Sequence, residues 1–287
     1  MGLTGLVDQG LRGEGDINPG LVQSLFHGAF HVGLEGKEIA RVHPDTHQKI
    51  DREIAQVVDL DKGFRIGFGA RVDFDAVQVT GIVQVRAADI AQADALGYVI
   101  RLIAEADADD GHLLQRVRPC LVAKDHPLAP VDGPTNAVVA EGNFSGRLLF
   151  QGAGAGDGPT ASAVVADLID IARAWENWGE VGAPFSMPVA QLAALPPAQP
   201  GNRMERAYLR FTVNDRPGVL AEITAAMRDA DVSIESLIQK GRASDGQEVL
   251  VAMVTHEGPE ANVAKALALL EGSDSLTAAP LVLPILA

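Results

Sequence analysis

The sequence predicts an α/β (α+β) protein in which a mixed-sheet domain is followed by a smaller ferredoxin-like domain. Strand-like and helix-like patterns alternate from about residue 67 to residue 174, and a stretch rich in proline and glycine then interrupts both patterns. The remaining residues follow the order β-α-β-β-α-β, which is the order of a ferredoxin-like fold. These observations divide the chain into four expected segments: 1–66, 67–174, a linker at 175–205, and 206–287.

Segment 1–66 is the least regular part, because glycines interrupt it repeatedly and no long amphipathic pattern develops. Two pairs of histidines have the i, i+4 spacing that can place two imidazoles on one helix face: His27/His31 and His43/His47. A glycine or proline interrupts each pair, and no cysteine or His-Glu-x-x-His sequence completes a zinc site. We therefore expect no metal site.

In segment 67–174 the residues from Val72 to Ile82 are strand-like, residues 87–96 are helix-like, and Tyr98–Ala104 form an apolar strand. Further along, residues 136–141 and 147–150 are predicted to pair as a hairpin around Gly142-Asn143. This order of elements is typical of a mixed α/β domain.

A glycine loop follows the second strand of that hairpin. The alternating residues Gly152, Gly154, Gly156 and Gly158 precede Pro159, which suits the first turn of a helix, and apolar residues then recur at helical spacing. Such a loop can bring backbone N–H groups close to a polar or anionic ligand. The spacing does not match the dinucleotide fingerprint G-x-G-x-x-G, so a loop that serves only as a tight turn is an equal alternative from spacing alone.

Composition limits the classes of function. The chain has 287 residues and a formal net charge of −15, which argues against binding to a nucleic-acid backbone. The single cysteine, Cys120, excludes an intramolecular disulfide, fits a reducing cytosol and is expected to be a small buried side chain rather than a nucleophile. No apolar run is long enough to span a bilayer, and the first residues lack the layout of a signal peptide. We expect a cytoplasmic protein that binds no membrane.

Several charged residues have ordinary structural explanations. The acidic residues at 107–110 are expected to form a solvated loop rather than a metal site. His126 precedes a proline, which favours a local structural role over that of a general base. Asp167 and Asp170 have the spacing of a solvated helix face, so they are not assigned as an acid–base pair.

Segment 206–287 has a clear order of elements. We expect a half-buried strand at 207–213, a turn at 214–218, a helix from Val219, strands at 234–240 and 248–255, a helix at 259–270 and a final strand at 281–286.

The glycine loop and its flanks resemble homoserine dehydrogenase. The relevant sequence is Gly-Arg-Leu-Leu-Phe-Gln-Gly-Ala-Gly-Ala-Gly-x-x-Pro-Thr-Ala-Ser-Ala-Val-Val-Ala-Asp, and the runs from Gly69 to Val77 and from Val117 to Val122 add to the resemblance. The resemblance implies an NAD(P)-dependent oxidoreductase that interconverts homoserine and aspartate semialdehyde in threonine, methionine and isoleucine biosynthesis. It also implies these cofactor-binding candidates: Gly152, Gly154, Gly156, Pro159 and Thr160.

The turn at 214–218 and its flanks resemble an ACT domain through Asn-Asp-Arg-Pro-Gly-Val-Leu-Ala. ACT domains commonly bind amino acids at the interfaces where they pair, so the resemblance implies an effector such as threonine and a homo-oligomer. The implied effector-binding candidates are Asn214, Asp215, Pro217, Gly218, Val219 and Leu220. The alternative is that the Pro-Gly pair only makes the turn, since fold alone does not fix function.

The resemblance covers about residues 67–287, and two features of the family are not found. No dinucleotide fingerprint follows a strand, and the pattern around Lys62 differs from the family's catalytic segment, so the catalytic residues stay unknown. We therefore expect the chain alone to be inactive. We also expect that the residues before about Phe64 are not genuine family sequence, as a shifted reading frame would produce. The choice between NAD and NADP stays open. The alternative function is an amino-acid-sensing or dimerisation module without catalysis.

Overall fold

The computed structural model describes residues 30–34, 70–71, 73–109, 111–133, 135–176, 191–199, 201–240 and 248–286. The first part contains β1 (Phe30–Leu34), a 3-10 helix (Phe74–Ala76), β2 (Gln78–Val79), α5 (Ala87–Ala95), β3 (Tyr98–Asp109), β4 (His112–Ala123), β5 (Thr135–Gly142), β6 (Gly146–Ala153) and α6 (Asp157–Glu176). The second contains β7 (Met204–Asn214), α7 (Val219–Asp229), β8 (Ile234–Lys240), β9 (Glu248–Thr255), β10 (Gly258–Pro259), α8 (Glu260–Leu269) and β11 (Leu281–Leu286).

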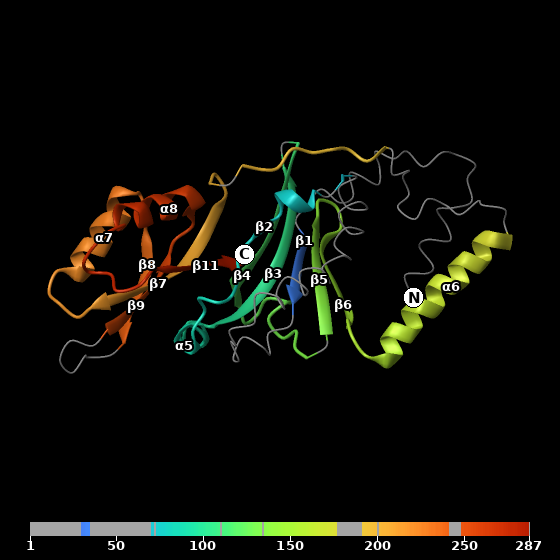
Figure 1. Ribbon diagram of the computed structural model, residues 1–287, viewed down its shortest axis with the longest axis horizontal. Helices are drawn as coiled ribbons and strands as arrows, with labels where there is room; N and C mark the ends of the chain where they lie inside the picture. Colours follow the sequence, from blue (N-terminus) through green and yellow to red (C-terminus); the bar gives the residue numbers. More distant parts are fainter. Residues whose placement is uncertain are drawn as a thin grey trace.

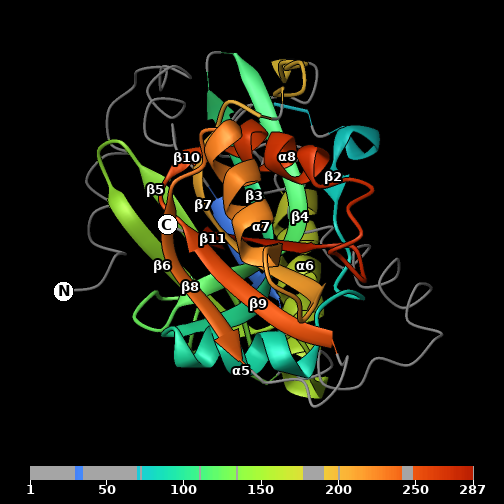
Figure 2. The ribbon, with the colours of Figure 1, turned by 90° about the vertical axis from the view of Figure 1, so that its left-hand side faces the viewer.

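The predicted mixed α/β architecture is confirmed, including the ferredoxin-like order of the C-terminal part. The strands form one sheet with the order β6-β5-β1-β3-β4-β11-β7-β9-β8, while β2 pairs with β4 and β10 with β7. Figure 1 shows this sheet along the long axis of the molecule, with α7 and α8 on one side of the C-terminal strands and α5 on the other. Figure 2 gives the view from the end that carries α7 and α8.

The final strand joins the two parts of the sheet. β11 pairs antiparallel with β7 from Leu281 to Ile285, and it pairs parallel with β4 through Ile285 opposite Leu121 and Leu286 opposite Val122. One hydrophobic core lies across this junction and includes Ile100 and Leu121 from one part and Tyr208 and Leu283 from the other. The C-terminal region therefore shares its sheet and one core with the first part.

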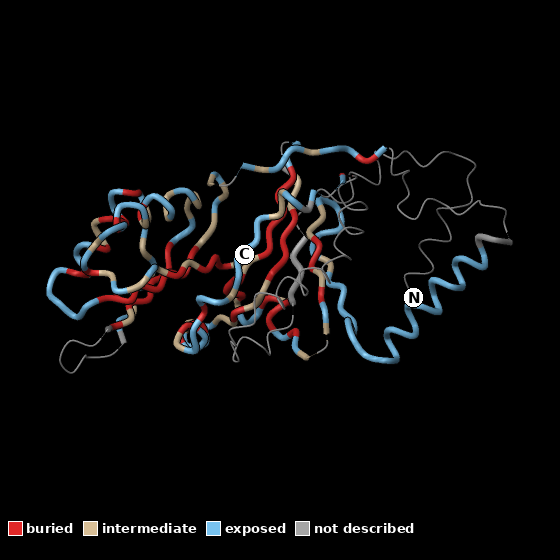
Figure 3. Tube along the Cα trace, in the orientation of Figure 1, coloured by how far each residue is buried: buried red, intermediate tan, exposed pale blue. Residues whose placement is uncertain are grey.

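The C-terminal part has a further core, which packs α7 and α8 on the sheet. Phe211 of β7 and Val251 of β9 contribute to it from the strands, and Ile223 and Met227, four residues apart on one face of α7, contribute from the helix. Figure 3 shows the buried residues concentrated along the central strands, whereas α6 is exposed along its length.

Several local predictions are confirmed. Residues 136–141 pair with 147–152 in the expected hairpin, and Gly146, the first residue of β6 after the turn, has φ +66°. The helix at 87–96 is α5, the final strand is β11, and the strand from Tyr98 is β3.

Other local predictions are wrong. The strand expected between Val72 and Ile82 is reduced to a 3-10 turn and the two-residue β2. Asp107 and Asp109 are not in a loop, because β3 continues to Asp109, and the Asp107 carboxylate accepts a 2.6 Å bond from Arg203 Nη1. Asp110 lies outside the described residues. Aspartate is rare in strands, so the sequence favours a loop at Asp107. Its partner Arg203 lies 96 residues away in sequence and could not be predicted from the local pattern.

Segment 1–66 contributes one described strand. β1 pairs antiparallel with β3 and with β5, so it lies between two strands of the region that resembles homoserine dehydrogenase. His31 lies in this strand, which differs from the helical arrangement considered for His27/His31. The remaining histidines of that segment and Lys62 lie outside the described residues. Within the described ranges, no helix is both long and apolar enough to cross a bilayer.

Candidate functional site

The predicted cofactor loop connects the edge strand β6 to α6. Gly152 is still in β6, opposite Asn136 of β5, and the chain leaves the sheet at Gly154. A side chain at Gly154 would lie 2.0 Å from Asn136 Nδ2, so the Asn136 amide occupies the space that any Cβ there would need. Asn136 is itself exposed, so a side chain at position 154 would push this amide aside, and glycine leaves room for it where it lies.

Gly156 and Pro159 form the start of α6. Gly156 has φ +122°, a backbone conformation that side chains rarely adopt, and its carbonyl accepts a 3.0 Å bond from the Thr160 N–H. The helix begins at Asp157, two residues before the proline that predicted its start. All five candidates, Gly152, Gly154, Gly156, Pro159 and Thr160, are exposed, so they lie together on the surface at the base of the helix.

The charge at this loop limits what it can bind. Helix N-termini attract anions, but the first turn of α6 already carries the Asp157 carboxylate. A phosphate at this position would meet that like charge. The exposed backbone next to Gly154 and Gly156 is therefore better suited to an uncharged polar part of a cofactor than to its phosphates.

The helix that follows has no partner in the described structure. α6 is 20 residues long, and its residues from Asp157 to Arg173 are exposed. Its large apolar side chains are each 45–59% exposed: Val164, Val165, Leu168, Ile169 and Ile171. Asp170 and Arg173 lie off this face and form an exposed pair, as predicted for a solvated side of the helix. An apolar face of this size on a solvated helix indicates a surface that another structure covers.

The predicted effector loop follows the end of β7. Asn214 is tied to the segment 273–277, because its backbone N–H donates to Ser275 O at 3.1 Å and its side-chain Nδ2 donates to Asp274 O at 3.1 Å. Arg216 Nη2 donates to Ser275 Oγ at 3.0 Å, and the hydroxyls of Ser273 and Ser275 donate to the Glu222 carboxylate. These bonds attach the loop and the start of α7 to the segment 273–277.

The effector candidates differ in exposure. Asn214, Asp215, Pro217 and Gly218 are exposed, whereas Val219 is buried in the C-terminal core and Leu220 packs partly against it. Gly218 precedes α7 with φ +98°, which explains why glycine begins that helix. A ligand at this loop would meet the backbone, rather than the side chain, of Val219.

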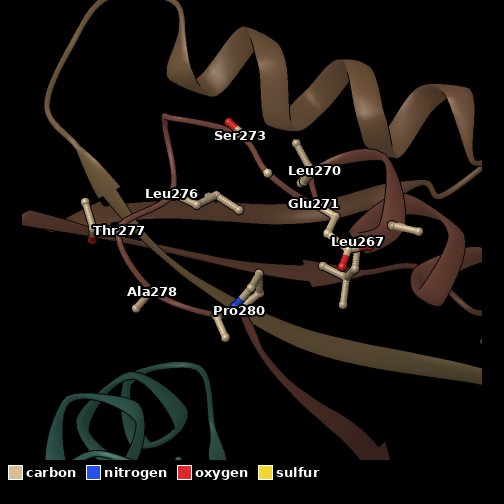
Figure 4. A pocket seen from close by; sticks show the side chains of 11 residues that line it. Leu267, Leu270, Glu271, Ser273, Leu276, Thr277, Ala278 and Pro280 are labelled. Atoms are coloured by element: carbon tan, nitrogen blue, oxygen red, sulfur yellow. The ribbon is translucent and has the colours of Figure 1, made fainter.

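A cavity of about 520 Å³ lies next to this loop, between the end of α8 and the segment that leads into β11. Figure 4 shows Leu267, Leu276 and Pro280 along its border. None of the effector candidates lines it, but Ser273 does and also bonds Glu222 of α7. The cavity is thus connected to the effector loop through the 273–277 segment.

Two other residues considered from the sequence have structural roles. His126 is buried, and its Nδ1 accepts a 3.1 Å bond from the Leu128 N–H, which confirms a local role. Cys120 is buried at 1% exposure, and desolvation by burial raises the pKa of its thiol to about 12, so it is not a nucleophile at neutral pH. No group of three or more potential metal ligands occurs among the residues the structure describes.

The sequence did not predict the buried ionic residues at the junction of the sheet. Asp89, Glu105, Arg116 and Arg210 are each at most 6% exposed. The alternation gave no signal for them: Arg210 lies between Leu209 and Phe211, at a position where an alternating strand predicts an exposed polar residue.

Comparisons with known protein families agree with the resemblances found in the sequence. Residues 64–169 match the family model described as homoserine dehydrogenase, and residues 207–271 match the model of the ACT domain. A homoserine dehydrogenase of Synechocystis is 39% identical over 228 residues, which are 77% of this chain and 52% of the relative. A homoserine dehydrogenase of Pseudomonas aeruginosa is 36% identical over 74% of this chain and 49% of the relative.

Solved structures give the same result. A homoserine dehydrogenase from Thiobacillus denitrificans superimposes with a TM-score of 0.76 at 29% identity, over 92% of this chain and 65% of that chain. A Staphylococcus aureus homoserine dehydrogenase, at 21% identity and a TM-score of 0.59, shares the fold. The chain spans about half the length of the curated relatives it matches.

Proposed function

We propose that this chain, which resembles homoserine dehydrogenase at residues 64–169 and carries an ACT domain at 207–271, is the C-terminal part of an NAD(P)-dependent homoserine dehydrogenase. The reaction interconverts homoserine and aspartate semialdehyde in the cytoplasm, within threonine, methionine and isoleucine biosynthesis. We keep the division into 1–66, partial catalytic domain 67–174, linker 175–205 and ACT domain 206–287. The observation that carries the proposal is the family match across the glycine loop and α6.

The role we assign to the glycine loop is to contact the cofactor. NAD(P) accepts or donates the hydride when it is bound, and the protein supplies its position relative to the substrate. Gly154 and Gly156 keep side chains away from the surface at the base of α6, with Gly152, Pro159 and Thr160 around them. The nearby Asp157 carboxylate supports contact with the nicotinamide or ribose end rather than with the phosphates.

The exposed face of α6 supports a second element of the proposal. We assign it to a dinucleotide-binding domain, because such a domain must meet the glycine loop and the apolar face begins at Val164, about two helical turns after Gly156. Without that domain the loop alone cannot hold a dinucleotide, so we expect no turnover by the chain by itself.

The test is a chimera. The part of the Synechocystis relative that the match does not cover is fused before residue 64 of this chain, and homoserine-dependent reduction of NAD⁺ and of NADP⁺ is measured. Activity in the chimera and none in the chain alone are the expected results. Gly154→Ala should lower that activity because its Cβ displaces the Asn136 side chain, whereas Gly81→Ala, outside the glycine loop and with open space around its Cβ, should not. A folded chimera that is inactive with both cofactors would contradict the proposal.

A second candidate function is amino-acid sensing or dimerisation by the ACT domain without catalysis. It is favoured by the exposed Asn214–Gly218 loop, whose position is fixed by bonds to the 273–277 segment. β8 is the last strand in the sheet order, so one edge has no neighbour among the described strands and suits pairing with a second copy. Calorimetry with L-threonine, together with sedimentation of the chain, tests this function. If L-threonine gives no heat and the chain forms no dimer, this function is excluded.

A further inference from the structure

One group of buried charges lies where the C-terminal region meets the first part of the sheet. We call it the strand cluster: Glu105 of β3, Arg116 and Arg118 of β4, and Glu205 of β7. Arg116 Nε lies 2.6 Å from Glu105 Oε2, and Arg118 Nη2 lies 2.7 Å from Glu205 Oε2. The four side chains are at most 15% exposed, so β7 is bound to β3 and β4 by charges largely removed from water.

A second group lies at the other end of the same junction. We call it the helix cluster: Asp89 of α5 with Tyr208 and Arg210 of β7. Arg210 Nε lies 2.8 Å from Asp89 Oδ1, and the Tyr208 hydroxyl donates to the same oxygen at 3.1 Å. The other Asp89 oxygen accepts a 2.8 Å bond from the Arg86 N–H at the start of α5. Asp89 is completely buried, so all its bonds come from protein groups.

The two clusters hold β7 from opposite faces of the sheet. Side chains alternate along a strand, so Glu205 points to one face while Tyr208 and Arg210 point to the other. β11 lies between β7 and β4 and fills the sheet between the clusters. Pulling β7 away from β4 and α5 would leave buried charges of both signs unpaired, which is costly in a medium of low polarity.

The same strand ends in the predicted effector loop. Arg210 Nη1 donates to Thr212 Oγ1 at 3.2 Å, the Thr212 carbonyl accepts a 2.9 Å bond from the Thr277 N–H, and Asn214 then begins the loop. The helix cluster is therefore four residues from the loop along one rigid strand, with no turn or hinge between them.

We propose that β7 is a regulatory relay: the two clusters fix it to α5, β3 and β4, so that a shift of the effector loop moves the catalytic sheet instead of being absorbed at a domain boundary. This inference rests on the proposed effector site for its biological use. The mechanical part, one cooperative unit across the junction, stands on the buried clusters alone. Coupling of this kind needs an element whose state both sites influence, and β7 is that element.

Hydrogen exchange of the whole chain tests the mechanical part. Peptides from α5, β4 and β7 should share one slow rate in the wild type. Arg210→Met should speed exchange in both β7 and α5 by roughly 100-fold, because Asp89 is left buried without its cation. The matched control is Arg147→Met, which removes the partly exposed pair with Glu141 and should change neither. Faster exchange in β7, β9 and β8 with unchanged exchange in α5 would overturn the relay. If Arg210→Met does not fold, Tyr208→Phe provides the milder test with the same two outcomes.

L-threonine is the probe for the regulatory part, with binding followed by calorimetry on the same samples. Where threonine binds, protection should extend from residues 214–220 through β7 to α5 in the wild type, and it should stop at β7 in Tyr208→Phe. Threonine that binds but protects only the loop and α7 in the wild type would overturn the relay. Threonine that does not bind would count against the effector site alone, and the exchange rates of the unliganded chain would then decide the relay.

Discussion

Arg116 and Glu105 form a buried ion pair between β3 and β4, with 2.6 Å between Nε and Oε2 and exposures of 5% and 6%. Arg116 also lies 3.3 Å from Glu205 and 3.4 Å from Glu260, so one guanidinium serves carboxylates from β3, β7 and α8. Its removal leaves these carboxylates without a shared cation.

The first prediction is that Arg116→Met lowers the free energy of unfolding by about 3 kcal/mol, because the buried Glu105 loses its nearest cation and keeps only Arg118 and Arg203, each at 3.5 Å. Urea unfolding measures this. Lys124→Met is the control, since Lys124 and Asp94 are 49% and 72% exposed, and it should cost at most about 1 kcal/mol. Equal losses in the two variants would contradict a role for burial.

The second prediction concerns the glycine loop. Gly156→Ala should destabilise the chain by about 1–3 kcal/mol, because φ is +122° there and a side chain strains the backbone however much space surrounds it. Gly152→Ala, without close neighbours and without positive φ, should change stability by no more than about 0.5 kcal/mol. Thermal unfolding of both variants makes the comparison, and indistinguishable midpoints would rule out the described conformation of Gly156.

The third prediction concerns the apolar face of α6. Leu168→Ser with Ile171→Ser should reduce concentration-dependent association of the chain, because each side chain is 59% exposed. The stability of the sheet should be unchanged, since these residues belong to none of the hydrophobic cores. Sedimentation at several concentrations measures association, and Asp170→Asn, on the other side of the helix, is the control. Unchanged association in the double variant would mean that other surfaces cause it.

The fourth prediction is that Cys120 resists thiol reagents in the folded chain. Burial raises the pKa of its thiol from 9.0 to about 12, and the folded state therefore favours the protonated form. This contribution to stability is complete below about pH 9 and is lost as the pH rises through about 12. Iodoacetamide at pH 8 should label Cys120 only after unfolding in urea. Fast labelling without urea would show that the β4 region opens readily, and Cys120→Ala identifies labelling at other sites.

Local patterns were sufficient to predict most of the fold. The alternation in β7, the Gly-Asn turn of the β5–β6 hairpin and the helical spacing after Gly156 each depend on residues close in sequence, and all three elements form. The expected half-buried strand at 207–213 is instead buried on both faces, because α5 packs on the face that carries Tyr208 and Arg210. The insertion of β11 between β4 and β7 was not predictable in this way, because the parallel pairing of Ile285 with Leu121 joins residues far apart in sequence.

The same distinction holds for the candidate sites. The glycine loop and the Asn214–Gly218 turn were found because each is a short contiguous sequence. The helix cluster was missed because Asp89 and Arg210 are 121 residues apart and each alone resembles an ordinary surface charge. The close contact between position 154 and Asn136 was also hidden, since it depends on a side chain of the neighbouring strand.

The position of β11 constrains the order in which the chain can fold during synthesis. Its neighbours β4 and β7 are both translated earlier, and each exposes an unpaired edge towards the place that β11 later fills. The ribosome must pass residue 286 before the two halves of the sheet can join, so both edges stay open while residues 215–286 are added. A chaperone that shields strand edges would therefore act on this protein in that interval, after β7 is made and before β11 pairs.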